Sequence, residues 1–458
     1  MTRPSLSPSA GGALPVTARL AEQAAGLEHD AIPGEIRQMA RQCVLDWFAA
    51  TLAGAGEELA GMIAAEAAEE GGTPVATLIG HRARAPMQQA ALVNGTTSHA
   101  LDYDDVHLSY IGHPTVTLLP AILALGEGLR ASGAEIITAF VAGYETICRI
   151  GLLTAPGHYA LGFHATATLG SFGAAAACAR LLKLDPARTA MALGIAGTEA
   201  AGLKSMFGTM CKPLHAGKAA QNGLLAARLA ARGFTSRSDV LECAQGFAAT
   251  HGPDFHPEAA LAAPPGGWHL RSNLFKYHAA CYLTHAPVEC ALAIARTPGF
   301  AADPLREAVL TIDRGADKVC NIAAPQTGLE AKFSLRRTVT MALAGIDTAA
   351  LDAYSAATAT DPRLVALGER LRIVFVEGWP SSKAELSVTL ASGRKLSARH
   401  DSGIPANDVM AQGRRLEDKF RSLTTPVIGA AGSKRLLQAV SRIEDCPDIA
   451  GLTALATG

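Results

Sequence analysis

The hydrophobic periodicity of this chain changes once, near residues 264–267, and this change most constrains the fold. Before it, apolar residues recur every three to four positions, as they do along one face of a helix. After it, a period of two appears: residues 306–313 alternate, as a strand with one buried face does, and residues 371–376 and 384–390 are strong strand signals. The sequence therefore predicts a mainly α protein, with a large all-helical domain and a smaller α+β domain.

Turn residues divide the first part of the chain into helices, which we expect at 16–30, 34–53, 57–70, 85–101, 115–130, 133–151, 170–184, 186–200 and 213–232. In the second part we expect helices at 284–295, 334–344 and 364–369, and a hairpin that joins 384–390 to 394–398. Residues 405–441 are helical again and are expected to return to the first domain. The expected domains are 16–265 together with 405–458, and 266–404.

Length, charge and cysteine spacing exclude several classes of protein. A chain of 458 residues is too long for one ordinary core, and a net charge of −1 gives no general attraction to nucleic acid or anionic membranes. The nine cysteines form no CxxC pair and are typical of small buried residues in a reducing cytosol. The N-terminus has no apolar signal segment, and no apolar run is long enough for a membrane span. We therefore expect a cytoplasmic protein with no nucleic-acid or membrane partner.

One polar stretch, residues 94–113, stands between two apolar helical segments. It contains three carboxylates and three imidazoles: Asp102, Asp104, Asp105, His99, His107 and His113. Catalytic groups often lie on such connections, held by a rigid scaffold. Taken singly, each of these residues is more often a helix cap or a satisfied buried polar group.

Three proton-carrying or cationic residues precede expected helix starts. His113 and Lys212 each stand directly before a proline, and His164 lies ahead of a long alanine-rich helix. Helix N-termini offer unpaired N–H donors and partial positive charge, so converging ends would bind a small polyanion. The three aspartates would then position or tune the imidazoles. The alternative is that the three residues are unrelated helix caps with a purely structural role.

Two further segments concentrate reactive side chains. Residues 205–217 place Thr209 and His215 near Lys212 but lack the spacing of a phosphate-binding Walker loop. Residues 273–285 contain Lys276, His278, Cys281 and His285, without the two ligand pairs typical of a zinc site. We therefore predict no metal.

Five motifs in order resemble the MmgE/PrpD family, which includes 2-methylcitrate dehydratase, cis-aconitate decarboxylase and iminodisuccinate epimerase. They are Asn94-Gly-x3-His-x2-Asp-Tyr-Asp-Asp, Gly112-His-Pro, Gly162-Phe-His, Gly208-Thr-Met-x-Lys-Pro-Leu-His, and a Lys-x4-Cys element from Lys276. The resemblance covers roughly residues 30–440. It implies a helical domain built from both ends of the chain, an α+β lid domain, an active site between them, and a homodimer. It also implies that the reaction needs neither a metal nor an organic cofactor.

The positions that match the family's functional residues are Asp102, His113, His164, Lys212, Lys276 and Cys281. We expect Asp102, His113, His164, Lys212 and Cys281 to be catalytic, and Lys276, Asp105, Thr209, His215 and Tyr103 to bind substrate. In decarboxylase members the position of Cys281 is a histidine used in protonation, so the cysteine is a departure that argues against decarboxylation. The longer interval from Asp102 to His113 is similar to epimerase-type members.

The expected function is a cofactor-independent lyase of the dehydratase type. A small di- or tricarboxylate would lose a proton α to a carboxylate, taken by His113 or His164. The lysines and helix ends would stabilise the resulting enediolate. Epimerisation and decarboxylation are alternatives from the same first step, and a non-catalytic helical binding protein is the alternative from another class.

Overall fold

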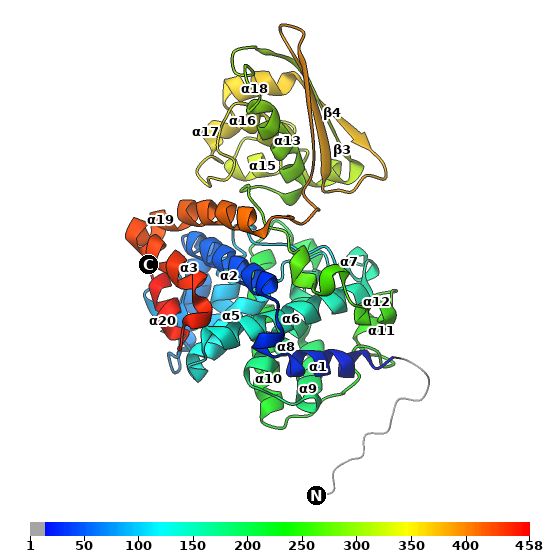
Figure 1. Ribbon diagram of the computed structural model, residues 1–458, viewed down its shortest axis with the longest axis vertical. Coiled ribbons are helices and arrows are strands. Elements are labelled where there is room, and N and C mark those ends of the chain that lie inside the picture. Colours follow the sequence, from blue (N-terminus) through cyan, green and yellow to red (C-terminus); the bar gives the residue numbers. More distant parts are fainter. Residues whose placement is uncertain (1–13) are drawn as a thin grey trace, which may run out of the picture. The chain divides into compact units, whose positions relative to one another are not determined.

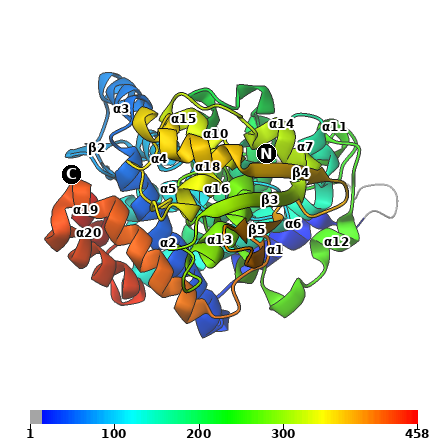
Figure 2. The same ribbon diagram turned by 90° about the horizontal axis from the view of Figure 1, so that it is seen from above.

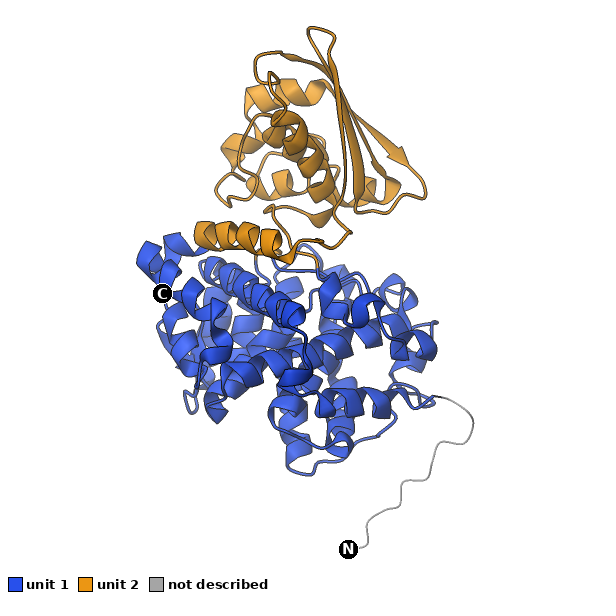
Figure 3. Ribbon diagram, in the orientation of Figure 1, with its two compact units in different colours: residues 1–100, 104–273, 424–458 blue, residues 101–103, 274–423 orange. Residues whose placement is uncertain are grey.

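The computed structural model describes residues 14–458, and the chain folds into two compact units (Figure 3). Unit 1 comprises residues 1–100, 104–273 and 424–458, and unit 2 comprises 101–103 and 274–423. The division thus falls after 273 rather than after 265. It also falls inside the last long helix, at 423/424, because that helix continues without a loop to mark a boundary.

Unit 1 is built almost entirely from helices (Figure 1). They are α1 (Val16–Gly26), α2 (Gly34–Gly54), α3 (Glu58–Glu70), α4 (Met87–Ser98), α5 (Thr115–Leu129), α6 (Gly133–Thr154), α7 (Gly157–Ala160), α8 (Ala165–Leu181), α9 (Pro186–Glu199), α10 (Cys211–Ala231), α11 (Phe247–His251), α12 (Pro257–Leu261) and α20 (Ala450–Thr453). The expected mainly α class is confirmed. The expectation of an all-helical domain is wrong in one detail, because β1 (Ala76–Leu78) and β2 (Ala83–Ala85) form a two-stranded antiparallel sheet.

Helix α8 forms the core of unit 1. Every residue of α8 except Arg180 is buried, and α8 contacts α5, α6, α9 and α10. A helix that is apolar on all sides needs neighbours on all sides, and alanine and glycine let those neighbours approach closely. α6 is also long and apolar enough to cross a bilayer, but 89% of its apolar window is buried inside the protein, the pattern of a core helix.

Unit 2 contains a four-stranded sheet with helices on one side (Figures 1 and 2). The strands are β3 (Leu305–Asp313), β4 (Leu371–Val376), β5 (Lys383–Leu390) and β6 (Lys395–Asp401), in the order β4-β3-β5-β6. The helices are α13 (His285–Ala295), α14 (Asp317–Cys320), α15 (Gly328–Lys332), α16 (Leu335–Leu343), α17 (Ala356–Ala359) and α18 (Pro362–Glu369). The expected strands and hairpin are confirmed. That unit 2 acts as a lid stays a prediction.

Pairing in the sheet follows from chain connectivity. β3 pairs antiparallel with β5 and parallel with β4, which the chain reaches only after α14–α18, as a parallel neighbour requires. β5 alternates buried and half-buried side chains along its whole length. The turn to β6 passes through Gly393 at φ 88°, a conformation that favours glycine.

The remaining elements are one long helix and several short 3-10 helices. α19 (Val409–Ser441) is the long final helix, interrupted by a non-helical residue at Gly429. The 3-10 helices are η1 (His29–Ala31), η2 (Lys204–Met206), η3 (Pro265–Gly267), η4 (His269–Ser272), η5 (Tyr282–Thr284), η6 (Arg314–Ala316), η7 (Ile443–Asp445) and η8 (Ala454–Ala456).

Candidate active site

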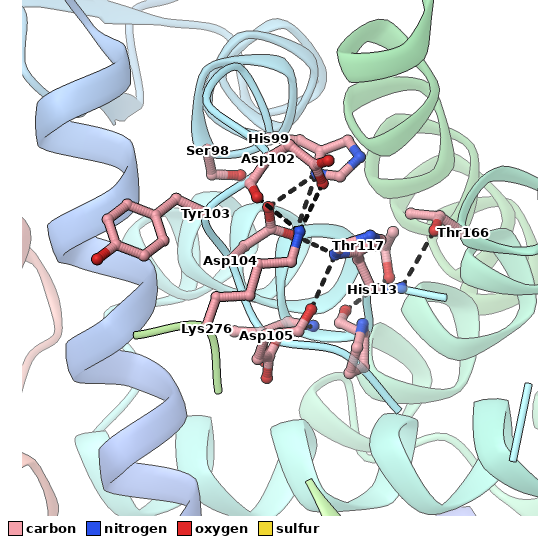
Figure 4. A network of polar contacts seen from close by, with 12 residues as sticks. Ser98, His99, Asp102, Tyr103, Asp104, Asp105, His113, Thr117, Thr166 and Lys276 are labelled. Carbon is pink, nitrogen blue, oxygen red and sulfur yellow. Dashed lines mark hydrogen bonds and ion pairs between the residues drawn. The ribbon is translucent and has the colours of Figure 1, made fainter. Parts of the chain in front are cut away.

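A buried carboxylate joins two imidazoles in unit 1 (Figure 4). His99 follows the last residue of α4, and His113 lies one residue before Pro114, the N-cap of α5. The carboxylate of Asp104, from the loop between them, lies 2.9 and 3.1 Å from His99 Nδ1 and 2.9 Å from His113 Nδ1. The backbone N–H of His113 donates to Thr166 in the first turn of α8, which fixes the loop against the core helix.

These contacts define which ring nitrogens are basic. Nδ1 of His113 also lies 2.9 Å from the carbonyl oxygen of Asp105, so it faces two acceptors and carries the proton. His99 Nδ1 faces both oxygens of Asp104 in the same way. In the neutral rings the lone pair is therefore on Nε2, the nitrogen directed away from the carboxylate. A carboxylate behind an imidazole holds the tautomer that a general base needs.

The charge in this network lies on Asp104. Burial alone would raise the pKa of Asp104, but the imidazoles of His99 and His113 hold it well below its usual value. Burial lowers the pKa of His99 to about 4, although Asp104 opposes the change. At neutral pH the arrangement is thus an ionised carboxylate beside a neutral His99.

A second imidazole pair, His164 and His215, lies beside the first. The Nδ1 atoms of His164 and His215 are 2.9 Å apart, so one ring donates and the other accepts. The centroids of the His99 and His164 rings are 6.2 Å apart. Burial lowers the pKa of both His164 and His215, and the nearby positive charge of Lys212 lowers both further. Four imidazoles, those of His99, His113, His164 and His215, thus lie together in unit 1.

Close helix packing brings these groups together. A Cβ on Gly95 of α4 would lie 2.6 Å from the Cα of Gly217 in α10, and one on Gly217 would lie 2.2 Å from Leu92 O. Only glycines permit this approach, which sets the start of α10 against the end of α4. His164 is the N-cap residue of α8. Lys212 lies inside the first turn of α10, rather than ahead of the helix as expected, because proline is tolerated in a first turn.

Asp105 has a different environment from the one expected. Its carboxylate accepts hydrogen bonds from Thr115 Oγ1 at 2.5 Å and, more weakly, from Thr115 N at 3.4 Å. Burial raises the pKa of Asp105 to about 8, despite the Thr115 hydroxyl, and Asp46 and Asp104 raise it further. Its carboxyl therefore contacts the start of α5, and the expected role of Asp105 in substrate binding stays a prediction.

Lys276 and Asp102 form a pair within unit 2. Lys276 is almost fully buried, and its Nζ lies 2.8 Å from Asp102 Oδ1 and 2.6 Å from Asp102 O. Asp102 has a φ of 50°, a left-handed conformation that aspartate tolerates better than most residues. The adjacent Tyr103 is fully buried, and its hydroxyl donates to Ala349 O. Tyr103, expected to bind substrate, thus packs in the interior of unit 2.

Cys281 has a thiol partner that its sequence position does not reveal. Cys281 and Cys320 both lie in the apolar core of unit 2, and their thiols interact, while the Cys320 thiol also donates to Ala316 O. The interaction between the two thiols lowers the pKa of Cys281, against the effect of burial, and raises that of Cys320. Cys281 is therefore the more acidic thiol of the two.

The other polar candidates have local partners. The exposed Thr209 donates to Met206 O and accepts from Cys211 N, so its hydroxyl stabilises the turn before α10. His278 lies between Glu289 and Thr348 in unit 2. Neither residue shows a contact, within residues 14–458, that distinguishes it as a substrate or metal ligand.

Two groups of side chains in unit 1 have the composition of a metal site. His107, Cys148 and His269 are buried with ligand atoms within 4.8 Å of one another, and His99, Asp104 and His113 are similarly close. However, His107 uses both ring nitrogens, with Nε2 3.0 Å from His269 O and Nδ1 accepting from Ser109 N. In the second group both Nδ1 atoms are directed at the same carboxylate. Hydrogen bonding thus accounts for the nitrogens of His107 and for the Nδ1 atoms of the second group.

His99 and Asp104 belong to the polar stretch noted in the sequence. Asp104 was one of the three aspartates expected to position or tune the imidazoles, but neither residue was among those predicted to be catalytic or substrate-binding. The available signal was the motif itself, because residues at a helix C-terminus and in the following loop often converge. The family motif drew attention to Asp102 instead, whose carboxylate pairs with Lys276.

The fold and this site define a mainly helical protein with a buried cluster of imidazoles around one carboxylate, and comparison with known proteins identifies its family. The MmgE/PrpD N-terminal domain matches residues 18–260, and the MmgE/PrpD C-terminal domain matches residues 278–445. The chain therefore belongs to the MmgE/PrpD family.

Several curated relatives are named as decarboxylases. The chain is 32% identical to the cis-aconitate decarboxylase of Aspergillus terreus (strain NIH 2624 / FGSC A1156) over 288 residues, 60% of this chain and 59% of the relative. This match spans less than two thirds of the relative's length. The chain is 27% identical to the cis-aconitate decarboxylase-like protein oryM of Aspergillus oryzae, with 97% of each chain covered. It is 28% identical to the cis-aconitate decarboxylase of Homo sapiens, covering 82% of this chain and 80% of the relative.

Proposed function

We propose that this protein is a lyase that acts on a small di- or tricarboxylate by removing a proton α to a carboxylate. The observation that carries the proposal is the position of Asp104 between His99 and His113, which leaves Nε2 of His113 as a base. Side-chain exposure favours His113 over His99, since the His113 side chain is 12% exposed and that of His99 is fully buried. His113 is thus the proposed general base.

The first turn of α10 supplies positive charge that complements the negative charge of the substrate. Lys212 and the N–H groups at that helix end would bind a substrate carboxylate by charge-assisted hydrogen bonds. As His113 takes the α-proton, negative charge moves onto this carboxylate, and the same groups stabilise the enediolate. His164 and His215, kept neutral by burial, would accept or return a proton in the next step.

The fate of the enediolate decides between dehydration and epimerisation. We propose dehydration, in which the electron pair expels a β-hydroxyl that a neighbouring acid protonates. We also propose that Cys281 is catalytic and that Lys276 binds substrate, and these two roles are supported only by the family resemblance. Decarboxylation of an aconitate-like acid is the second candidate, supported by the names of the curated relatives. It does not pass through the enediolate, because the electron pair left by the departing carbon dioxide must be protonated by an acid of the site. Epimerisation, by return of the proton to the opposite face, starts from the enediolate.

Proton NMR in deuterium oxide distinguishes these outcomes with no cofactor added. The protein is incubated separately with 2-methylcitrate, citrate and cis-aconitate. Dehydration produces a new alkene, decarboxylation produces carbon dioxide and a product containing deuterium, and epimerisation exchanges the α-proton without net loss of mass. If the protein exchanges no proton in any of these compounds, the result would favour the alternative of a non-catalytic binding protein.

A parallel sample treated exhaustively with a chelator tests the proposed independence from metals. We expect the rate to survive chelation, because the proposed steps need only side chains and helix N–H groups. Loss of activity that one divalent ion restores would assign a metal role to a group such as His107, Cys148 and His269.

A further inference from the structure

Unit 2 contains a cavity of about 1350 Å³ that the proposed reaction does not use. All of its lining residues belong to unit 2, and they come from β3, β4, α16, the end of α17, α18, the loop after α14 and the residues that join α17, α18 and β4 (Figure 1). Its volume exceeds that of many small-molecule sites, which span roughly 300–1,000 Å³. Five arginines line it: Arg306, Arg336, Arg337, Arg370 and Arg372.

Arg337 is the central observation. This residue is 5% exposed, and its Nε and Nη1 atoms are buried with no hydrogen-bond partner among residues 14–458. A buried guanidinium without partners is costly, so native proteins nearly always provide one. The charge of Asp361 favours the charged form of Arg337, but less than burial opposes it. Arg337 lines the cavity and has two donors without an acceptor among residues 14–458, which points to an acceptor from outside the chain.

Two other arginines are fixed by the backbone. Arg336 donates to Gly368 O and Leu371 O, and Arg370 donates to Leu305 O. These bonds tie α16 to the end of α18 and to β4, and tie β4 to the start of β3. Each guanidinium has five N–H groups, so these bonds occupy only part of its donors. The cavity wall is therefore both rigid and rich in donors.

The balance of charge at the wall is positive. Arg306 and Arg372 are exposed at the cavity, where a ligand can enter from solvent. The carboxylates that line it belong to Glu307 and Glu369, fewer than the five arginines. Guanidinium groups bind carboxylate and phosphate oxygens in a bidentate geometry, whereas neutral ligands would leave the buried donors poorly matched.

Part of the remaining lining is apolar, alongside the polar Asn321, Gln326 and Thr360. Side chains of Leu364, Val365, Ile373 and Phe375 contribute to the wall. Such a surface favours the carbon skeleton of an organic molecule over a simple inorganic ion. The cavity thus combines a charged region around Arg337 with an apolar region on α18 and β4.

We propose that this cavity of unit 2 binds a small organic anion whose phosphate or carboxylate group is held by Arg337. The bound oxyanion accepts the hydrogen bonds of Nε and Nη1, and Arg306 and Arg372 add attraction at the entrance. This site is separate from the imidazole cluster of unit 1 and does not depend on the proposed reaction.

Isothermal titration calorimetry on the full chain tests this proposal, with pyrophosphate and citrate as probes. Arg337→Met keeps the length of the side chain but removes its donors. The control is Arg399→Ala, which removes an exposed arginine of the same unit that pairs with Glu385 on the sheet, outside the cavity. We expect Arg337→Met to weaken binding of at least one probe by about tenfold to a hundredfold, and Arg399→Ala to leave it unchanged.

The two probes separate the two sources of the oxyanion. Loss of pyrophosphate binding alone identifies a phosphate site, and loss of citrate binding alone identifies a carboxylate site. Citrate binding at the imidazole cluster would be insensitive to Arg337→Met, so it cannot imitate the expected result. The double variant Arg306→Ala/Arg372→Ala changes only exposed side chains and should weaken the same probe severalfold. If neither the single nor the double variant alters binding of either probe, the proposal is wrong.

Discussion

Asp104 and Asp105 are neighbours in the sequence, but the structure places their carboxyl groups in opposite electrostatic environments. Asp104 lies between two imidazoles, which keep its pKa well below the usual value. Asp105 is equally buried, but its partner is the neutral Thr115 and its neighbour is Asp46, so its pKa rises to about 8. The comparison shows that the partners of a buried carboxyl, and not its burial alone, decide whether it is charged.

The largest expected effect is that of Asp104→Asn. An amide cannot hold both Nδ1 protons of His99 and His113, so one ring adopts the wrong tautomer or turns away. In a comparable arrangement, loss of the carboxylate behind a catalytic imidazole costs about 10⁴-fold in rate. We expect kcat on the true substrate to fall by roughly that factor, measured in the NMR assay of substrate turnover.

The matched control for this variant is Asp105→Asn. It removes the neighbouring carboxyl, retains an oxygen that accepts from Thr115, and should change kcat less than about threefold if Asp105 only holds the helix start. Equal losses in both variants would contradict the assignment of separate roles.

The second prediction concerns the imidazole that Asp104 orients. His113→Ala should lower kcat by about 10²–10⁴-fold, because the general base is removed while the fold stays intact. Far-ultraviolet circular dichroism checks the fold. His164→Ala serves as the comparison: if it abolishes turnover and His113→Ala does not, the base belongs to the other imidazole pair.

The third prediction concerns substrate capture by the first turn of α10. Lys212→Met should raise KM by roughly one to two orders of magnitude, because a charge-assisted hydrogen bond to a carboxylate contributes about 1.5–3 kcal/mol. The melting temperature should change little, since Lys212 is only half-buried. A lower melting temperature with normal kinetics would instead assign Lys212 a structural role.

Much of the fold follows from local pattern. The alternation in residues 384–390 marks β5, because a strand with one buried face has a period of two, and the β-branched and aromatic run at 371–376 marks β4. The helical period likewise marks the long helices of unit 1. It fails at helix starts, as at Lys212, where a proline in the first turn imitates a boundary.

The partners within the candidate site could not be predicted in the same way. Nothing local distinguishes Asp102, Asp104 and Asp105, since their partners come from different segments: Lys276 for Asp102, two imidazoles for Asp104, and Thr115 for Asp105. The approach of Gly95 to Gly217, which sets the imidazole cluster, is likewise a contact between distant helices. The same holds for Arg337. That its Nε and Nη1 lack hydrogen-bond acceptors follows only from the folded structure, in which distant segments form the wall of the cavity.

The smallest expected effect is on the free energy of unfolding. Asp104 and Asp105 should contribute to it with opposite dependence on pH. Asp105 has a folded pKa of about 8, raised from 3.8, so between these values the folded state binds a proton that the unfolded state has lost. The contribution of Asp105 to the free energy of unfolding is fully present below its unfolded pKa, and it is lost as pH rises towards its folded pKa. Asp104, with a depressed pKa, behaves in the opposite way and loses its contribution as pH falls.

Urea unfolding of the wild type and Asp105→Asn, each at about pH 6 and about pH 7.5, measures this effect. Other buried groups also titrate, including His99, so the wild-type curve alone is not diagnostic. The difference between the two proteins removes these shared contributions. A fully coupled group changes the free energy of unfolding by about 1.4 kcal/mol per pH unit, so the advantage of the wild type should shrink by roughly 2 kcal/mol over this interval. A constant difference would mean that Asp105 is already ionised in the folded protein, and the contrast with Asp104 would then be wrong.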